Sequence, residues 1–175
     1  MSDQNQQTGS QNSTSLRLRP LLWLLGSVAT LSLVPFTTSF EGKKNVPYRD
    51  IGGVLTVCYG DATGIQDRRY SDADCQNMLV QQLAIHGKRV LRDAPYLKGH
   101  PYALAASVDF DYKTGRFAGS SMDKAFRMGQ WETGCKRFNE NAAGQPQWVY
   151  AAGEELPGLV RRAAARRALC ERDLK

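Results

Sequence analysis

Three side chains that could carry out acid–base chemistry lie close together in the sequence. Asp50 follows Glu41 by nine residues, and Thr56 follows Asp50 by six. Hydrolysis of a glycosidic bond needs two carboxyl groups, because one must donate a proton to the leaving oxygen while the other stays ionised. Glu41 stands at the end of an apolar segment, where partial desolvation favours a protonated carboxyl. Asp50 follows Arg49 in a polar turn, where its charged form is expected.

A predicted hairpin brings these groups together. Side chains alternate between two faces over residues 48–60, and Gly52 and Gly53 supply the turn. The hairpin is expected to fold Asp50 and Thr56 back toward the glutamate, where the threonine hydroxyl could hold an attacking water.

The chain after the hairpin is predicted to be helical. Ser71 as N-cap and Asp74 three residues later predict the start of a long helix that ends near Pro95. Shorter helices are expected over residues 102–110, 121–128, 131–138 and 157–174. This order predicts an α+β fold in which a small β-hairpin lobe is joined by a long helix to an all-α lobe. The last helix carries arginines that are expected to face solvent: Arg161, Arg162, Arg166, Arg167 and Arg172.

Length and charge restrict the class of protein. The chain has 175 residues, enough for one modest domain, and a net charge of +6 with a pI of about 9.3. Such a charge favours anionic partners. Nucleic acid is not expected to be one of them, because zinc-finger spacings, RNP-type aromatic runs and basic heptads are absent. No metal or other cofactor is expected either, since no C-x2–4-C pair occurs and His86 and His100 are far apart.

The four cysteines indicate an exported, disulfide-bonded protein. They are Cys58, Cys75, Cys135 and Cys170, and they all follow a segment that resembles an export signal. Four cysteines allow three pairings. The pairs Cys58–Cys75 and Cys135–Cys170 are favoured, because each joins near neighbours within one half of the chain. Reduced, buried thiols in a cytosolic enzyme are the alternative.

The N-terminal residues divide into two segments. Residues 1–19 are mostly Gln, Asn, Ser and Thr and are predicted to form a disordered tail. Residues 20–40 carry no charge, and as a helix they would span about 31 Å, enough to cross a bilayer. Arg17 and Arg19 predict that the N-terminal end of this span stays in the cytoplasm, so that residues 41–175 would be exported.

Only the first part of the apolar segment is strongly hydrophobic. Leucines and a tryptophan fill residues 21–25, whereas Gly, Ser, Thr and Pro dilute residues 26–39. A helix of this kind can insert into a bilayer but is held weakly, which favours a reversible span. A cleaved signal peptide, with its best small-residue site at residues 27–29, and a permanent anchor are the alternatives.

The string Phe-Glu-Gly-x4-Pro-Tyr-Arg-Asp-x-Gly-Gly-Val-Leu-Thr-Val-Cys-Tyr-Gly, over residues 40–60, resembles the active-site signature of phage-type lysozymes, glycoside hydrolase family 24. Residues 148–153 and 156–162 are similar to the tail motif of that family. The resemblance implies a lysozyme-like fold and hydrolysis of the β-1,4 bond between N-acetylmuramic acid and N-acetylglucosamine in peptidoglycan. It also implies Glu41 as general acid, Asp50 as the carboxylate that activates water, and Thr56 as the group that positions this water.

The weak apolar segment before Glu41 resembles that of the lambdoid signal-arrest-release endolysins. This resemblance implies that residues 20–40 tether an inactive enzyme to the inner membrane, with the N-terminus in the cytoplasm and the lysozyme domain, residues 41–175, in the periplasm. Release is then expected to let the segment pack into the fold, giving an active, monomeric periplasmic enzyme that lyses the host cell.

Two departures from the family pattern keep other functions in consideration. Residues 110–117 differ from the Phe-Asn-Val-Gly of many relatives by carrying Asp111, and Arg166 stands where relatives often have glutamate. A lytic transglycosylase needs only one catalytic acid, so Asp50 and Thr56 argue against that alternative. A catalytically inactive, tethered wall-binding protein is the other alternative.

Overall fold

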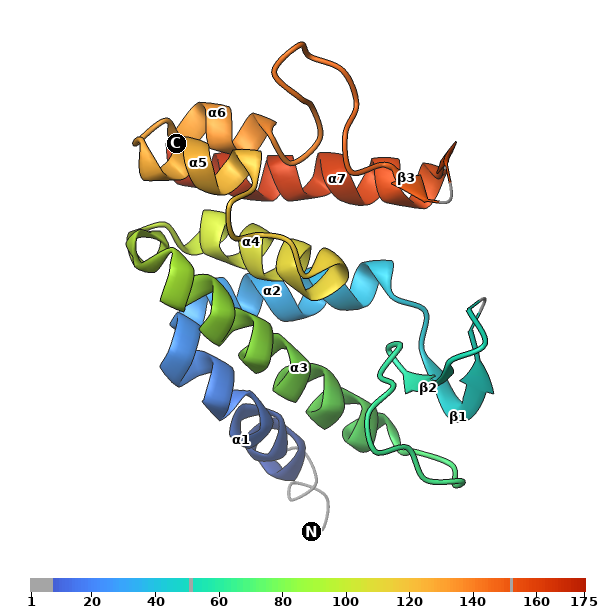
Figure 1. Cartoon of the computed structure of the whole chain (residues 1–175). Coiled ribbons are helices and arrows are strands. Elements are labelled where there is room, and N and C mark those ends of the chain that lie inside the picture. The colour runs from blue at the N-terminus through green and yellow to red at the C-terminus, as the bar shows by residue number, and fades with distance from the viewer. Residues whose placement is uncertain (1–7, 51, 152) are drawn as a thin grey trace, which may run out of the picture.

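The computed structural model describes residues 8–50, 52–151 and 153–175, and it places a small β lobe at one end of a long helix (Figure 1). The elements in chain order are α1 (Thr8–Leu25), α2 (Ser27–Phe40), β1 (Lys44–Arg49), β2 (Leu55–Cys58), α3 (Asp72–Asp93), the 3-10 helix η1 (Pro95–Gly99), α4 (Pro101–Thr114), α5 (Ser121–Arg127), α6 (Trp131–Lys136), β3 (Tyr150–Ala151), β4 (Glu154–Glu155), α7 (Pro157–Cys170) and the 3-10 helix η2 (Glu171–Leu174). The predicted α+β class is confirmed.

The long helix α3 begins at a capping box, as predicted. The Ser71 hydroxyl accepts a hydrogen bond of 3.0 Å from the Asp74 backbone N–H, and the Asp74 carboxylate accepts one of 2.9 Å from the Ser71 backbone N–H. The helix ends at Asp93, two residues before Pro95, because proline disfavours the helical conformation of the residue before it. Its N-terminal end lies beside the β lobe and its C-terminal end among the other helices (Figure 1).

The predicted hairpin is also present. Strands β1 and β2 are antiparallel, with Tyr48 opposite Thr56 and Arg49 opposite Leu55. Gly53 takes a φ of 77° in the turn between them, a conformation that glycine adopts without steric cost. Thr56 is buried, whereas Leu55 on the other face of the strand is exposed.

The apolar segment is not one continuous helix, contrary to expectation. Gly26 separates α1 from α2 with φ 82° and ψ 168°, a backbone conformation that is essentially restricted to glycine. Helix α1 begins at Thr8, within the segment predicted to be a disordered tail, and the buried Leu18 anchors it to the core. Residues 1–7 of that tail lie outside the described residues. Among the described helices, none combines the length and the apolar character needed to cross a membrane.

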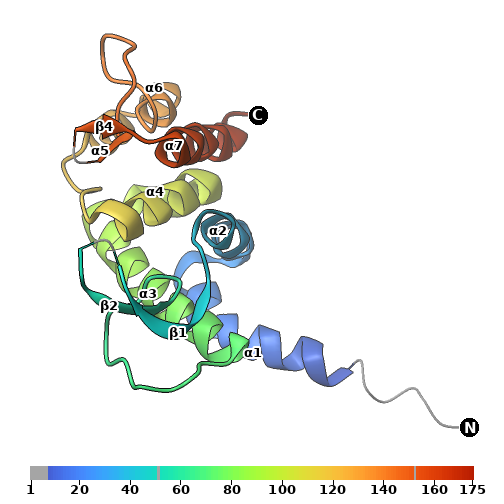
Figure 2. The same ribbon diagram turned by 90° about the vertical axis from the view of Figure 1, so that its right-hand side faces the viewer.

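Helices α1 and α2 are integral to the hydrophobic core. Helix α1 packs on α3, and α2 packs on α4 (Figures 1 and 2). Six residues of the two helices belong to the main buried cluster: Leu18, Leu21, Leu25, Ala29, Leu33 and Val34. Each fully buried leucine contributes about 1.5–3 kcal/mol relative to an exposed one. The fold therefore depends on the same segment that was predicted to span a membrane.

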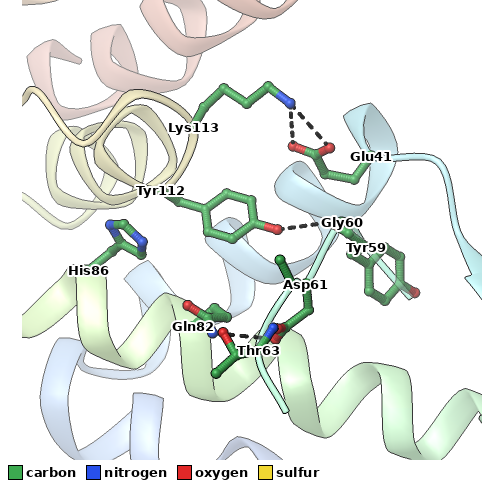
Figure 3. A pocket seen from close by; sticks show the side chains of 10 residues that line it. Glu41, Tyr59, Gly60, Asp61, Thr63, Gln82, His86, Tyr112 and Lys113 are labelled. Carbon is green, nitrogen blue, oxygen red and sulfur yellow. Dashed lines mark hydrogen bonds and ion pairs between the residues drawn. The ribbon is translucent and has the colours of Figure 1, made fainter. Parts of the chain in front are cut away.

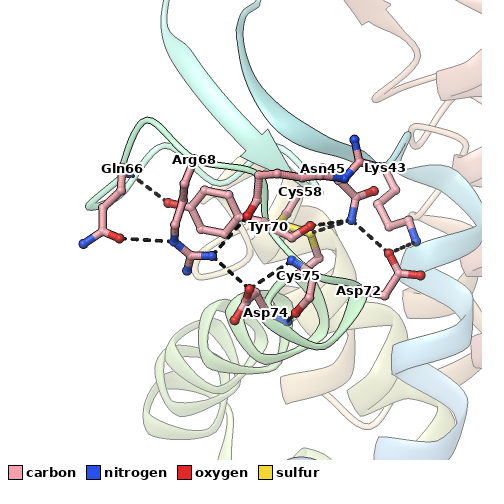
Figure 4. Close-up of a disulfide and its surroundings, with 11 residues drawn as sticks. Lys43, Asn45, Cys58, Gln66, Arg68, Tyr70, Asp72, Asp74 and Cys75 are labelled. Atoms are coloured by element: carbon pink, nitrogen blue, oxygen red, sulfur yellow. Dashed lines mark hydrogen bonds and ion pairs between the residues drawn. A yellow bond between two sulfur atoms is a disulfide. The ribbon is translucent and has the colours of Figure 1, made fainter.

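Two disulfides join distant elements, with the pairing favoured from the sequence. Cys58–Cys75 ties β2 to α3 (Figure 4), and Cys135–Cys170 ties α6 to the end of α7. Beside the first of these bonds, the Asn45 side-chain amide donates 2.9 Å hydrogen bonds to the Tyr70 carbonyl and the Asp72 carboxylate. The Cys58–Cys75 bond and the hydrogen bonds of Asn45 together hold the β lobe against the start of α3.

Candidate active site

Glu41 lies directly after the last residue of α2, where the chain leaves the core for the hairpin. Its carboxylate contacts two cations. Arg162 Nη1 lies 2.5 Å from Oε1. Lys113 Nζ lies 3.4 Å from each oxygen (Figure 3). Only 12% of the side chain is exposed. The carboxylate is thus largely removed from solvent, and cationic side chains surround it.

A pocket of about 270 Å³ opens beside Glu41. It is lined by Glu41, by the chain after β2, by α3 and by α4; the residues are Glu41, Tyr59, Gly60, Asp61, Ala62, Thr63, Gln82, His86, Tyr112 and Lys113. The Tyr112 hydroxyl donates a 3.0 Å hydrogen bond to the Tyr59 carbonyl and so closes one wall (Figure 3). Burial, together with the nearby negative charge of Glu41, raises the pKa of Tyr112, which therefore stays a neutral donor.

Asp50 and Thr56 lie on the hairpin rather than among the residues that line this pocket. Asp50 is exposed, and its Oδ1 accepts a 2.9 Å hydrogen bond from the Val54 backbone N–H across the turn. Thr56 is 4% exposed, and its hydroxyl donates to the Tyr48 carbonyl at 3.3 Å. The hairpin thus fixes the places of both side chains in the β lobe.

Asp61 is a second carboxylate in the pocket, and it was not predicted from the sequence. Its Oδ1 accepts a 2.8 Å hydrogen bond from the Thr63 backbone N–H, and its Oδ2 accepts one of 3.3 Å from the Gln82 amide. These partners are typical of a carboxylate that holds a loop in place. The only signal in the sequence is its position directly after Gly60, at the end of the signature.

Behind Glu41 lies a buried ionic network, whose partners come from α2, α4 and α7. Asp109 is fully buried and accepts hydrogen bonds from Thr37, Arg162 and Arg166. Burial alone would raise the pKa of Asp109, but the guanidinium groups of Arg166 and Arg162 lower it below its ordinary value. Asp109 is therefore an anion inside the protein.

The same network corrects the prediction for the last helix. Arg162 and Arg166 were expected to face solvent, but each is 2% exposed. The physical reason is Asp109, a buried anion that compensates the desolvation of both arginines. Arg161 and Arg172 are exposed, as predicted.

Asp111, the other departure from the family pattern, has a structural role. Its carboxylate lies 2.8 Å from His86 Nδ1 and 3.6 Å from Arg89 Nε, and it accepts a hydrogen bond from the Phe117 backbone N–H. Burial would raise the pKa of Asp111, but the hydrogen bonds from His86 and Phe117 lower it. Both departures, Asp111 and Arg166, are thus compensated by local partners and leave the pocket intact.

Comparison with known proteins identifies the class to which this fold and pocket belong. Residues 38–166 match the family model for phage lysozyme, so the chain belongs to the phage lysozyme family. The SAR-endolysin of Escherichia phage Mu is 36% identical over 126 residues, covering 67% of this chain and 66% of the relative. The SAR-endolysin of Enterobacteria phage P21 is 29% identical over 141 residues, covering 74% of this chain and 76% of the relative.

Solved structures show the same fold. The active form of the P1 phage endolysin Lyz superposes with a TM-score of 0.69 at 18% identity, covering 91% of this chain and 95% of that one. The muramidase domain of SpmX from Asticaccaulis excentricus gives a TM-score of 0.66 at 19% identity, covering 79% of this chain and 94% of that one. The lysozyme-like fold is therefore confirmed. The chain is a glycoside hydrolase of the muramidase type, an endolysin that degrades peptidoglycan and lyses the host cell.

Proposed function

We propose that Glu41 is the general acid in hydrolysis of the β-1,4 bond between N-acetylmuramic acid and N-acetylglucosamine. The observation that carries this proposal is the place of Glu41 in the pocket beside Tyr112 and Lys113, while Arg162 holds its Oε1. The guanidinium binds Oε1, whereas Oε2 has the longer contact with Lys113 Nζ, at 3.4 Å, on the pocket side.

Asp50 is proposed to activate the attacking water, with Thr56 positioning it. Its place supports the proposal, because the Asp50 side chain lies in the exposed turn of the hairpin and the Val54 N–H holds one of its carboxylate oxygens. An inverting enzyme keeps its two carboxyl groups about 6.5–9.5 Å apart so that water fits between one of them and the sugar. The reaction is then a single displacement, with water entering opposite the bond that Glu41 protonates.

Residues 20–40 are proposed to tether the enzyme to the inner membrane before it acts. In that state the N-terminus lies in the cytoplasm and residues 41–175 lie in the periplasm. Apolar side chains of α1 and α2 that the folded protein leaves in solvent support this proposal: Trp23 is 85% exposed and Leu31 is 61% exposed. Such side chains add nothing to the core but favour a bilayer. After release the enzyme is proposed to act as a periplasmic monomer.

The products of the reaction test the proposed chemistry. The full-length, oxidised protein would digest purified peptidoglycan, and the anomeric configuration of the first-formed reducing ends would be followed by NMR. We expect N-acetylmuramic acid reducing ends that are initially inverted. Initially retained configuration would contradict the single displacement, and a 1,6-anhydro sugar would identify a lytic transglycosylase instead.

A further inference from the structure

Asp109 connects the end of the apolar segment to the proposed general acid. Its Oδ1 accepts hydrogen bonds from Thr37 Oγ1 at 2.8 Å and from Arg162 Nη2 at 2.7 Å. Its Oδ2 accepts hydrogen bonds from Arg162 Nε at 3.0 Å and from Arg166 Nε at 2.7 Å. We propose that Asp109 is a positioning residue for Glu41 that acts through Arg162, and that Thr37 completes this arrangement when α2 docks. The inference rests on the proposed role of Glu41.

The geometry of Arg162 transmits the position of Asp109 to Glu41. A guanidinium group is planar, and two hydrogen bonds from Nε and Nη2 to one carboxylate fix both its place and its plane. With these two nitrogens engaged by Asp109, Nη1 is directed to Glu41 Oε1. The Arg162 side chain is only 3% exposed, so its surroundings leave little room for another orientation. The place of the Glu41 carboxylate therefore depends on a residue that does not touch it.

The charges of the network balance only when α2 is in place. Arg162 and Arg166 are cationic and deeply buried, and Asp109 supplies one compensating negative charge. Glu41 supplies the second, but it is carried into the network by the end of α2. Lys113 also approaches Glu41, but from the exposed side of the pocket. An undocked α2 would leave the two guanidinium groups with only one of their two carboxylate partners.

Thr37 marks the docked position of α2, and the same helix offers a matched control. Thr30 lies two turns earlier, is fully buried like Thr37, and its hydroxyl finds no hydrogen-bond partner among the described residues. Threonine and valine have nearly the same shape. Thr37→Val and Thr30→Val therefore remove the same group from the same helix, but only the first change affects Asp109.

The test measures kcat and KM separately, with solubilised glycan strands and the full-length, oxidised protein. Thr37→Val is expected to lower kcat about tenfold with KM nearly unchanged, because misplacement of a catalytic group costs rate rather than binding. Thr37→Ser, which keeps the hydroxyl, is expected to restore most of kcat, and Thr30→Val is expected to match the wild type. Asp109→Asn is expected to lower kcat by about 100-fold, and thermal unfolding would show that each variant is folded during the assay.

Several outcomes would overturn the inference. One is a Thr37→Val variant with wild-type kcat, and another is a Thr37→Val variant in which only KM rises. A third is a Thr37→Ser variant whose kcat is no higher than that of Thr37→Val. If Thr37→Val does not fold, a folded Asp109→Asn variant with wild-type kcat would overturn it equally. Glu41→Gln belongs in the same series, because its activity separates the two proposals. An active Glu41→Gln enzyme would refute the proposed acid, whereas an inactive one beside an unaffected Thr37→Val enzyme would refute only the positioning role.

Discussion

Leu25 of α1 fills the space that Gly87 leaves open on α3. A β-carbon built on Gly87 would lie 3.0 Å from Cδ2 of Leu25 and 3.2 Å from Cδ2 of Leu24. The absence of a side chain at Gly87 therefore lets α1 approach α3 closely enough to bury Leu21 and Leu25. This contact is one of the places where the apolar segment becomes part of the enzyme.

Gly87→Leu tests whether the enzyme needs α1 in this position. The added side chain would collide with Leu25, and overpacking of this kind costs about 1–3 kcal/mol. We expect a lower unfolding temperature and reduced lysis of cells, measured by thermal unfolding of the purified protein and by the turbidity of an expressing culture. The matched control is Gly99→Leu, since nothing lies within 4 Å of a β-carbon there. Equal stability of the two variants would show that the α1–α3 contact is dispensable.

Gly26→Ala tests the break between α1 and α2. Alanine is strained at φ 82° and ψ 168°, at a cost of about 1–3 kcal/mol, but it is favourable in a continuous helix. The substitution should therefore destabilise the folded enzyme and favour a straight, membrane-spanning segment. We expect a larger share of the protein in the membrane fraction and later lysis. Leucine at Gly26, Ser27 and Ser32 together should strengthen the effect, and unchanged timing in both variants would favour a cleaved signal peptide.

Asp50→Asn and Asp61→Asn separate the proposed catalytic carboxylate from its neighbour in the pocket. Asp50 is proposed to activate water, so replacing its carboxylate by the amide of asparagine should lower kcat about 10²–10⁴-fold. Asp61 binds the Thr63 N–H and the Gln82 amide, and an asparagine can keep at least one of these contacts. We therefore expect Asp61→Asn to retain most of the activity on purified peptidoglycan. If Asp61→Asn lost more activity than Asp50→Asn, Asp61 would be the second catalytic carboxylate.

Removal of the Cys58–Cys75 disulfide tests the link between the β lobe and α3. The bond closes a loop with a sequence separation of 17, for which the loss of a disulfide typically costs about 2–4 kcal/mol. The double variant Cys58→Ser, Cys75→Ser should unfold at lower denaturant concentration, while the Cys135–Cys170 bond stays intact. If its midpoint equals that of the wild type, the hairpin is held mainly by the hydrogen bonds of Asn45.

Local signals explain which parts of the fold could be predicted. The capping box at Ser71 and the glycines of the hairpin act over a few residues, so their outcome is readable from the sequence. Arg162 and Arg166 were wrongly predicted to face solvent, because their burial depends on Asp109, which lies more than fifty residues away in the chain. The two-residue strands β3 and β4 carry too short a pattern to be recognised.

The apolar segment was the hardest part to predict, for a physical reason. A helix that can enter a bilayer and a helix that can enter a protein core need the same apolar side chains. The sequence therefore does not reveal that Leu21 and Leu33 are fully buried in the folded enzyme, or that Gly26 divides the segment. Glu41, Asp50 and Thr56 were proposed as catalytic residues from the signature, whereas the ionic surroundings of Glu41 are visible only in the structure.

Glu41→Gln is the most direct test of the account. Glutamine keeps the shape of the side chain but cannot donate the proton, and Glu155→Gln, at an exposed position of β4, is the matched control. Both full-length proteins would be assayed on purified peptidoglycan, beside the wild type. We expect Glu41→Gln to lose about 10²–10⁴-fold in kcat while remaining folded, and Glu155→Gln to be unaffected. A folded Glu41→Gln enzyme with wild-type activity would refute Glu41 as the general acid.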